Sequence, residues 1–212
     1  MTELTYTLLG DGPSDEVLLR HLAWLIGQHL SPEISTRPQW GDLRACRERP
    51  IGLAQRIRTA LILYPCDLLF VHRDAENQMP QTRYDEIQRA IEQNGVESMP
   101  AVCVVPVRMQ EAWLLFDETA IRQAVGNPNG RVKLSLPPPT TAEAIPDPKA
   151  VLYETLRKAS ELTGRRLKKF SESHAARRLA EYITDFSPLR QLRAFRRLEN
   201  DLQQFIEAKG WN

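Results

Sequence analysis

Acidic side chains follow two apolar runs of this sequence, at the points where each run meets a turn. Asp11 follows the run 4–9, and Asp74 and Glu76 follow the run 67–71. Both runs are expected to form buried strands, and in open α/β sheets ligands collect at the carboxyl ends of the strands. Carboxylates that meet at one point repel one another unless a hard cation such as Mg²⁺ neutralises them. If the two strands are neighbours, the spacing predicts a metal site formed by Asp11, Asp74 and Glu76.

Two more residues are candidates for the same site. Glu111 lies in the first turn of a helix that is expected to start at the end of another apolar run, 101–107. It is therefore expected at the same edge of the sheet, where it would be a catalytic acid beside Asp11 and Asp74. His72 directly follows the apolar residues of the second run. An imidazole is a poor ligand for Mg²⁺ and suits Mn²⁺ or Zn²⁺ better. His72 is therefore expected outside the metal ligands, bonded to a metal-bound water or to Asp74.

Each candidate also has a purely structural interpretation. Asp11 in a Gly-Asp-Gly turn could cap the helix that follows, and a loop residue such as Glu76 is usually a solvated surface group. His72 could be a half-buried histidine that is held by hydrogen bonds. Glu111 could be a favourable acid at a helix N-terminus. The sequence leaves these alternatives open.

The elements that would position these residues alternate between strand and helix. Hydrophobic spacing predicts strands at 4–9, 67–71 and 101–107 and a short edge strand at 34–40, because Pro38 excludes a central one. Helices are expected between them at 17–28, 51–64 and 84–94, with Ser14 as the N-cap of the first. The order β-α-β-α-β-α-β predicts an α/β fold with a mainly parallel, Rossmann-like sheet flanked by helices.

The C-terminal third is expected to be helical and basic. We place the α/β core at 1–135, a stiff Pro-rich connector at 136–147 and a helical part at 148–212 that packs on the core. The net charge of the chain is +1, yet residues 148–212 hold 14 Lys and Arg against 8 Asp and Glu. This asymmetry is typical of an anion-binding surface or of a solvated helical face. The candidates for nucleic-acid binding are Lys149 and the four arginines of one expected helix face (187–208), Arg190, Arg193, Arg196 and Arg197.

Composition excludes several other classes. No apolar run reaches the roughly 20 residues of a membrane span, and a secretory signal is not evident because Glu3 stands where a basic region is expected. The three cysteines are scattered without CxxC spacing, which favours reduced thiols and a cytoplasmic location. The motifs of P-loop NTPases, α/β-hydrolases and zinc proteases are missing.

These stretches, in this order, resemble the TOPRIM-like fold of topoisomerases, primases and a class of nucleases. In that fold a strand ending in Glu-Gly and a later strand ending in Asp-x-Asp hold Mg²⁺ for phosphoryl transfer. The chain more narrowly resembles the bacterial domain-of-unknown-function family 4276, a family of TOPRIM-like proteins. The matching segments are Gly10–Asp15, Asp74–Glu76, Glu111-Ala-Trp-Leu-Leu-Phe-Asp117 and Pro148-Lys149. Two departures from the wider class are Asp11 in place of Glu and His72 in place of the first Asp.

The resemblance implies Mg²⁺- or Mn²⁺-dependent hydrolysis of phosphodiesters, in a bacterial protein that works beside an ATPase partner in defence against phage. Alternatives are a non-catalytic module that binds nucleic acid or a partner through its basic helices, and a nucleotide-binding regulator that uses the same acidic edge. A homo-oligomer is compatible with each of these.

Overall fold

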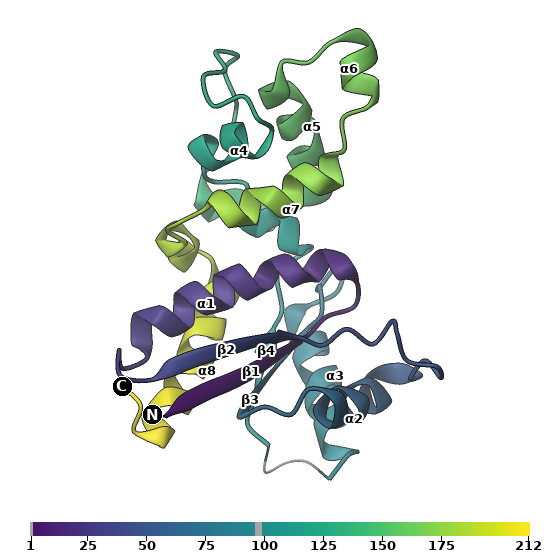
Figure 1. Cartoon of the computed structure of the whole chain (residues 1–212), viewed down its shortest axis with the longest axis vertical. Helices are drawn as coiled ribbons and strands as arrows, with labels where there is room; N and C mark the ends of the chain where they lie inside the picture. The colour runs from purple at the N-terminus through teal and green to yellow at the C-terminus, as the bar shows by residue number, and fades with distance from the viewer. Residues whose placement is uncertain (1, 96–98) are drawn as a thin grey trace. The chain divides into compact units, whose positions relative to one another are not determined.

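The computed structural model describes residues 2–95 and 99–212, and its strands form a four-stranded parallel sheet (Figure 1). The strand order is β2-β1-β3-β4, and every neighbouring pair is parallel. The predicted α/β fold with a parallel sheet is therefore confirmed, including the place of the Pro38 strand at one edge of the sheet. The strands are β1 (Glu3–Leu9), β2 (Ser35–Trp40), β3 (Leu68–His72) and β4 (Ala101–Val104).

One helix follows each of the first three strands and returns the chain to the start of the next. Figure 1 shows α1 on one face of the sheet, with α2 and α3 on the other. Because β2 and β3 lie on opposite sides of β1, the sheet has a topological switch point between β1 and β3. The helices are α1 (Leu18–His29, preceded by the 3₁₀ turn η1, Pro13–Val17), α2 (Gly52–Leu63) and α3 (Pro80–Glu92).

The core follows from the alternation of side chains along the strands. Leu9, Leu69 and Val71 pack with Ile57 of α2 and Ile87 of α3. The residues between them point to the opposite face, where the rings of Tyr6 and Phe70 meet edge to face at 5.7 Å. The central strands β1 and β3 are therefore covered on both sides, and the chain segments that follow them are held in place at the sheet edge.

The chain divides into two units at a place that differs from the expected boundaries. Unit 1 comprises Met1–Val105 and Arg197–Asn212, and unit 2 comprises Pro106–Arg196. β4 is the last strand of the sheet, and the segment after it packs with the helices of unit 2, which explains a division near Pro106. Unit 2 holds η2 (Gln110–Leu114), α4 (Glu118–Ala124), η3 (Pro139–Ala144), α5 (Pro148–Ser160), α6 (Gly164–Lys168), α7 (Glu172–Tyr182) and η4 (Ser187–Gln191).

The long C-terminal helix is shorter than its pattern suggests. An unbroken helix was expected over 187–208, but η4 ends at Gln191 and Leu192 is extended, so α8 spans Arg193–Lys209. Arg190 therefore lies outside the helix that carries Arg193, Arg196 and Arg197. The described residues include no helix that is both long and apolar enough to cross a membrane.

Candidate functional site

Asp11 and Asp74 follow neighbouring strands and lie at the same edge of the sheet. Leu9 of β1 is in register with Val71 of β3, so Asp11 stands two residues beyond this pair and Asp74 three. The expectation that β1 and β3 are adjacent is thus confirmed. This edge is also the switch point of the sheet, the usual place of ligands in such folds.

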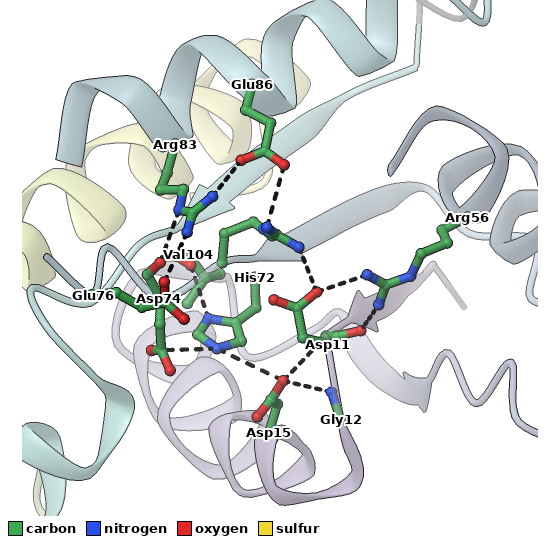
Figure 2. A network of polar contacts seen from close by, with 12 residues as sticks. Asp11, Gly12, Asp15, Arg56, His72, Asp74, Glu76, Arg83, Glu86 and Val104 are labelled. Carbon is green, nitrogen blue, oxygen red and sulfur yellow. Dashed lines mark hydrogen bonds and ion pairs between the residues drawn. The ribbon is translucent and has the colours of Figure 1, made fainter. Parts of the chain in front are cut away.

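Asp11 is held by two guanidinium groups. Its Oδ1 atom lies 2.7 Å from Nη1 of Arg56 and 2.8 Å from Nη1 of Arg73 (Figure 2). Arg56 also donates to the carbonyl oxygen of Gly10, so its planar group spans the turn. The Asp11 side chain keeps 42% of its surface exposed. Asp11 is therefore a solvent-accessible carboxylate whose charge is already neutralised.

Asp15 is a second carboxylate at this edge, and the sequence pattern did not single it out. The residue is 5% exposed, and its Oδ2 accepts hydrogen bonds from the backbone N–H groups of Asp11, at 2.7 Å, and Gly12, at 3.0 Å. The N-cap of α1 is Val17, and the N-cap of the 3₁₀ turn before it is Gly12, so the expectation that Ser14 caps the first helix is wrong. An acid three residues after the second glycine of a tight turn is the signal that could have identified Asp15, since Asp readily bonds nearby backbone N–H groups.

His72 lies between Asp15 and Asp74 and is 2% exposed. Its Nδ1 atom lies 3.0 Å from the carbonyl oxygen of Val104. Because a carbonyl oxygen only accepts, Nδ1 carries the proton. The other nitrogen, Nε2, lies 3.6 Å from Oδ1 of Asp74 and 3.8 Å from Oδ2 of Asp15 (Figure 2). Two carboxylates therefore face the ring nitrogen whose proton or lone pair is free for chemistry.

Glu76 points to an arginine. Its Oε2 atom lies 3.2 Å from Nη2 of Arg83, and its side chain is 60% exposed. Arg83 also donates from Nε to the carbonyl oxygen of Asp74, at 3.0 Å, and pairs with Glu86, which in turn contacts Arg73. A chain of alternating charges thus connects Glu76 to the arginine that holds Asp11. The arginines of this chain of charges come from separate helices and loops, so no local sequence pattern predicts that they meet.

Glu111 and Lys149 belong to unit 2, where they contact each other. Oε1 of Glu111 lies 3.7 Å from Nζ of Lys149, and the Lys149 ammonium lies 5.8 Å from the centre of the Tyr153 ring. Glu111 is 8% exposed, in the 3₁₀ turn η2 and not in the expected α-helix. The predicted catalytic role of Glu111 and phosphate contact of Lys149 stay predictions.

The four predicted nucleic-acid arginines are in different settings. Arg193 and Arg196 are exposed on α8. The guanidinium of Arg197 lies 3.4 Å from the centre of the Tyr84 ring and donates to Gln81 at 3.2 Å. Arg190 is partly buried in η4. Arg197 is exposed like Arg193 and Arg196, but its guanidinium already contacts Tyr84 and Gln81, which distinguishes it from the other two as a contact for a phosphate backbone.

The available donors suit a divalent cation in kind, but not in their present arrangement. Two carboxylates and an imidazole nitrogen surround the space beside His72, a set that favours Mn²⁺ or Zn²⁺ over Mg²⁺. Within the described ranges, no three His, Cys, Asp or Glu side chains converge closely enough to hold a metal ion. Binding an ion would require these side chains, or Asp11 with its arginines, to rotate.

Comparison with known proteins gives no relative from which to assign a role. No family model matches this chain, and no curated protein or solved structure is significantly similar to it.

A pocket of about 200 Å³ adjoins Asp11 on the side of β2. It is formed by the β1–η1 turn, the loop after β2 and the start of α2. The acid in that loop, Asp42, receives two side-chain hydrogen bonds from Arg44, at 2.8 and 2.7 Å. These bonds lower the pKa of Asp42 to about 2, so it is ionised at neutral pH and its charge is matched by Arg44.

Proposed function

We propose that the chain is a metal-dependent phosphodiesterase of TOPRIM-like type that acts on nucleic acid. One observation carries the proposal: Asp11, Asp15, Asp74 and His72 gather at the carboxyl ends of β1 and β3, the switch point of a parallel sheet. Acids and an imidazole concentrated there are expected of a catalytic centre more than of a structural ion pair.

The proposed roles follow from what each side chain contacts. Asp15 and Asp74, with Asp11, would hold Mg²⁺ or Mn²⁺, and Glu76 is a further candidate ligand. A divalent cation at such a site polarises the scissile phosphate and lowers the pKa of bound water. His72 would accept or donate a proton at Nε2, because Nδ1 is held by Val104.

Arg56 and Arg73, which now bind the Asp11 carboxylate, could bind a substrate phosphate in its place. Both guanidiniums now neutralise Asp11. A phosphate that approaches this edge offers pairs of oxygens that a guanidinium fork can bind in bidentate fashion, as it can bind a carboxylate. In our proposal a substrate phosphate would bind Arg56 and Arg73 in place of the Asp11 carboxylate, which would then be one of the residues able to hold a cation.

The wider setting is proposed from the sequence resemblance alone. We propose that the protein works in the bacterial cytoplasm, with an ATPase partner, in defence against phage. The exposed Arg193 and Arg196, together with Lys149 and the other two arginines, would add affinity for nucleic acid through phosphate contacts. Self-association is compatible with this role.

A second candidate is a non-catalytic module that binds anions at the same edge. The double pairing of Asp11 with Arg56 and Arg73 favours it, since two guanidiniums aimed at one carboxylate also fit a phosphate. In this case the acids hold the loops in place, and the site keeps the fold of an enzyme without its metal.

The decisive experiment combines cleavage and metal binding in the full-length chain. Single-stranded DNA, duplex DNA and RNA are incubated with the protein in Mg²⁺, Mn²⁺ or EDTA, and metal affinity is measured by calorimetry. If the protein is a nuclease, cleavage should depend on the metal, and Asp15→Asn and Asp74→Asn should each reduce its rate at least about 100-fold. Glu33→Gln, an exposed acid in the loop before β2, is the matched control. Anion binding without metal binding or cleavage would favour the module.

A further inference from the structure

The pocket beside Asp11 has the chemistry of a nucleotide site. The residues that line it include two large apolar residues, Trp40 and Leu43, and among its charged residues are Arg49 and Arg56. The ring of Trp40 packs closely against the backbone of Gly10, so close that a Cβ atom there would lie 2.7 Å from Cη2. This packing fixes a flat aromatic group beside the strand end that carries Asp11.

The charges around the pocket leave a place for an anion. Two acids line the pocket, and each is paired with an arginine. Asp11 lies 2.7 Å from Arg56, and Asp42 lies 2.7 Å from Arg44. Arg49 also lines the pocket, is exposed, and has no ion pair among the residues that the structure describes. A phosphate that enters would therefore meet one unused guanidinium, and a second one in Arg56.

We propose that this pocket binds one unpaired nucleotide of a single strand, with the base against Trp40 and Leu43 and the phosphate at Arg49 and Arg56. A base supplies the flat apolar face that an aromatic side chain stacks on, and its phosphate supplies the charge that the arginines bind. This inference deepens the proposed nuclease function, on which it rests for its biological meaning, by naming single-stranded nucleic acid as the substrate class.

The size of the pocket argues for a single unpaired base. At about 200 Å³ it is smaller than the roughly 300–1,000 Å³ of pockets that enclose drug-sized ligands. A base pair stacked in a duplex exposes only its edges in the grooves and cannot place a ring face against Trp40. A terminal or unstacked nucleotide can do so, and its phosphate then lies on the side of Asp11.

The test measures binding of AMP, adenosine and inorganic phosphate to the full-length chain by calorimetry in EDTA. AMP is expected to bind about tenfold or more tightly than either fragment, because only AMP engages both halves of the pocket. Arg49→Ala should weaken AMP about tenfold, the value of one charge-assisted contact. Arg47→Ala is the matched control, since Arg47 is an exposed neighbour outside the pocket lining. Circular dichroism confirms that each variant is folded.

The outcomes separate this inference from the proposed cleavage. Phosphate binding as tight as AMP binding would overturn the base site, and so would AMP binding that Arg49→Ala does not change, or no AMP binding at all. AMP binding that survives Asp74→Asn, in a protein that cleaves nothing, would support the pocket and refute only the nuclease. Cleavage of duplex and single strands at equal rates, unaffected by Arg49→Ala, would overturn the pocket and retain the nuclease.

Discussion

Nε2 of His72 lies 3.6 Å from Oδ1 of Asp74, and the ring is oriented by the bond between Nδ1 and the carbonyl oxygen of Val104. Asp15 lies on the same side of the ring, with Oδ2 at 3.8 Å. Two carboxylates thus approach the same ring nitrogen in a nearly buried site. The ring contributes to stability as well as to any chemistry at this edge.

Replacing His72 by aspartate tests this arrangement. His72→Asp puts a third carboxylate beside Asp15 and Asp74, so without metal the free energy of unfolding should fall by about 3 kcal/mol or more. Mg²⁺, which prefers oxygen ligands, should restore much of this loss and preserve or improve cleavage. Thermal unfolding in EDTA and in Mg²⁺ measures the difference. His72→Asn is the neutral control and should show a much smaller response to Mg²⁺; an equal response in both variants would contradict the metal site.

Gly10 tests the close packing of the turn. A Cβ atom at position 10 would lie 2.7 Å from Cβ of Asp15 and from Cη2 of Trp40. Gly10→Ala should therefore lower the free energy of unfolding by about 1–3 kcal/mol, the usual cost of overpacking. Gly27→Ala, in α1 where a Cβ meets nothing within 4 Å, should raise it by about 0.5–1 kcal/mol. Urea unfolding of both variants measures this. Equal stabilities would show that Trp40 moves freely.

The hydroxyl of Tyr6 predicts a change in stability at high pH. It is buried without a hydrogen-bond partner among the described residues, and burial raises the pKa of Tyr6 from 10.0 to about 12. Between these values the unfolded chain releases the proton while the folded protein retains it, so stability falls as pH rises through this window. Tyr6→Phe removes this loss, and near neutral pH it should be neutral or stabilising, by up to about 1–3 kcal/mol.

The measurement is the urea midpoint of wild type and Tyr6→Phe in a pH series that starts at neutral pH, below the window set by the shift in pKa, and ends at about pH 11, inside it. The difference between the two proteins should grow with pH in favour of Phe. Burial also raises the pKa of Cys103 to about 12, so its thiol contributes a similar loss to both proteins and cancels in the comparison. A destabilised Tyr6→Phe at neutral pH would indicate that the hydroxyl is bonded to an internal water.

The arginines of α8 should divide into two classes. Arg193→Ala and Arg196→Ala are each expected to weaken binding of single-stranded DNA and to reduce the salt slope of binding by about 1. Arg197→Ala should instead lower the free energy of unfolding by about 0.5–1 kcal/mol, because its guanidinium stacks on Tyr84. Fluorescence anisotropy across salt concentrations measures the first effect and urea unfolding the second. If all three variants reduce the slope equally, Arg197 leaves Tyr84 to bind nucleic acid.

Local pattern was sufficient for most of the sheet. Apolar runs with turn residues on either side identified β1, β3 and β4, and Pro38 identified β2 as an edge strand, because a residue without an N–H cannot pair on both sides. The helix that contains Ile57 was also expected within a residue or two of its observed ends. Local pattern failed at two places. At Gln110–Leu114 the spacing of apolar residues predicts an α-helix but the chain forms a 3₁₀ turn, and at Leu192 one extended residue interrupts an amphipathic run.

By itself, the sequence determined which acids stand at strand ends, because alternation and turn residues act over a few positions and need no distant partner. Only the tertiary structure decided what those acids contact. Asp11 meets Arg56 and Arg73, which lie 45 and 62 residues away in the chain. His72 reaches Asp15 because β1 and β3 pair in one register. These contacts depend on how strands and helices pack, and periodicity carries no information about which charged side chains that packing brings together.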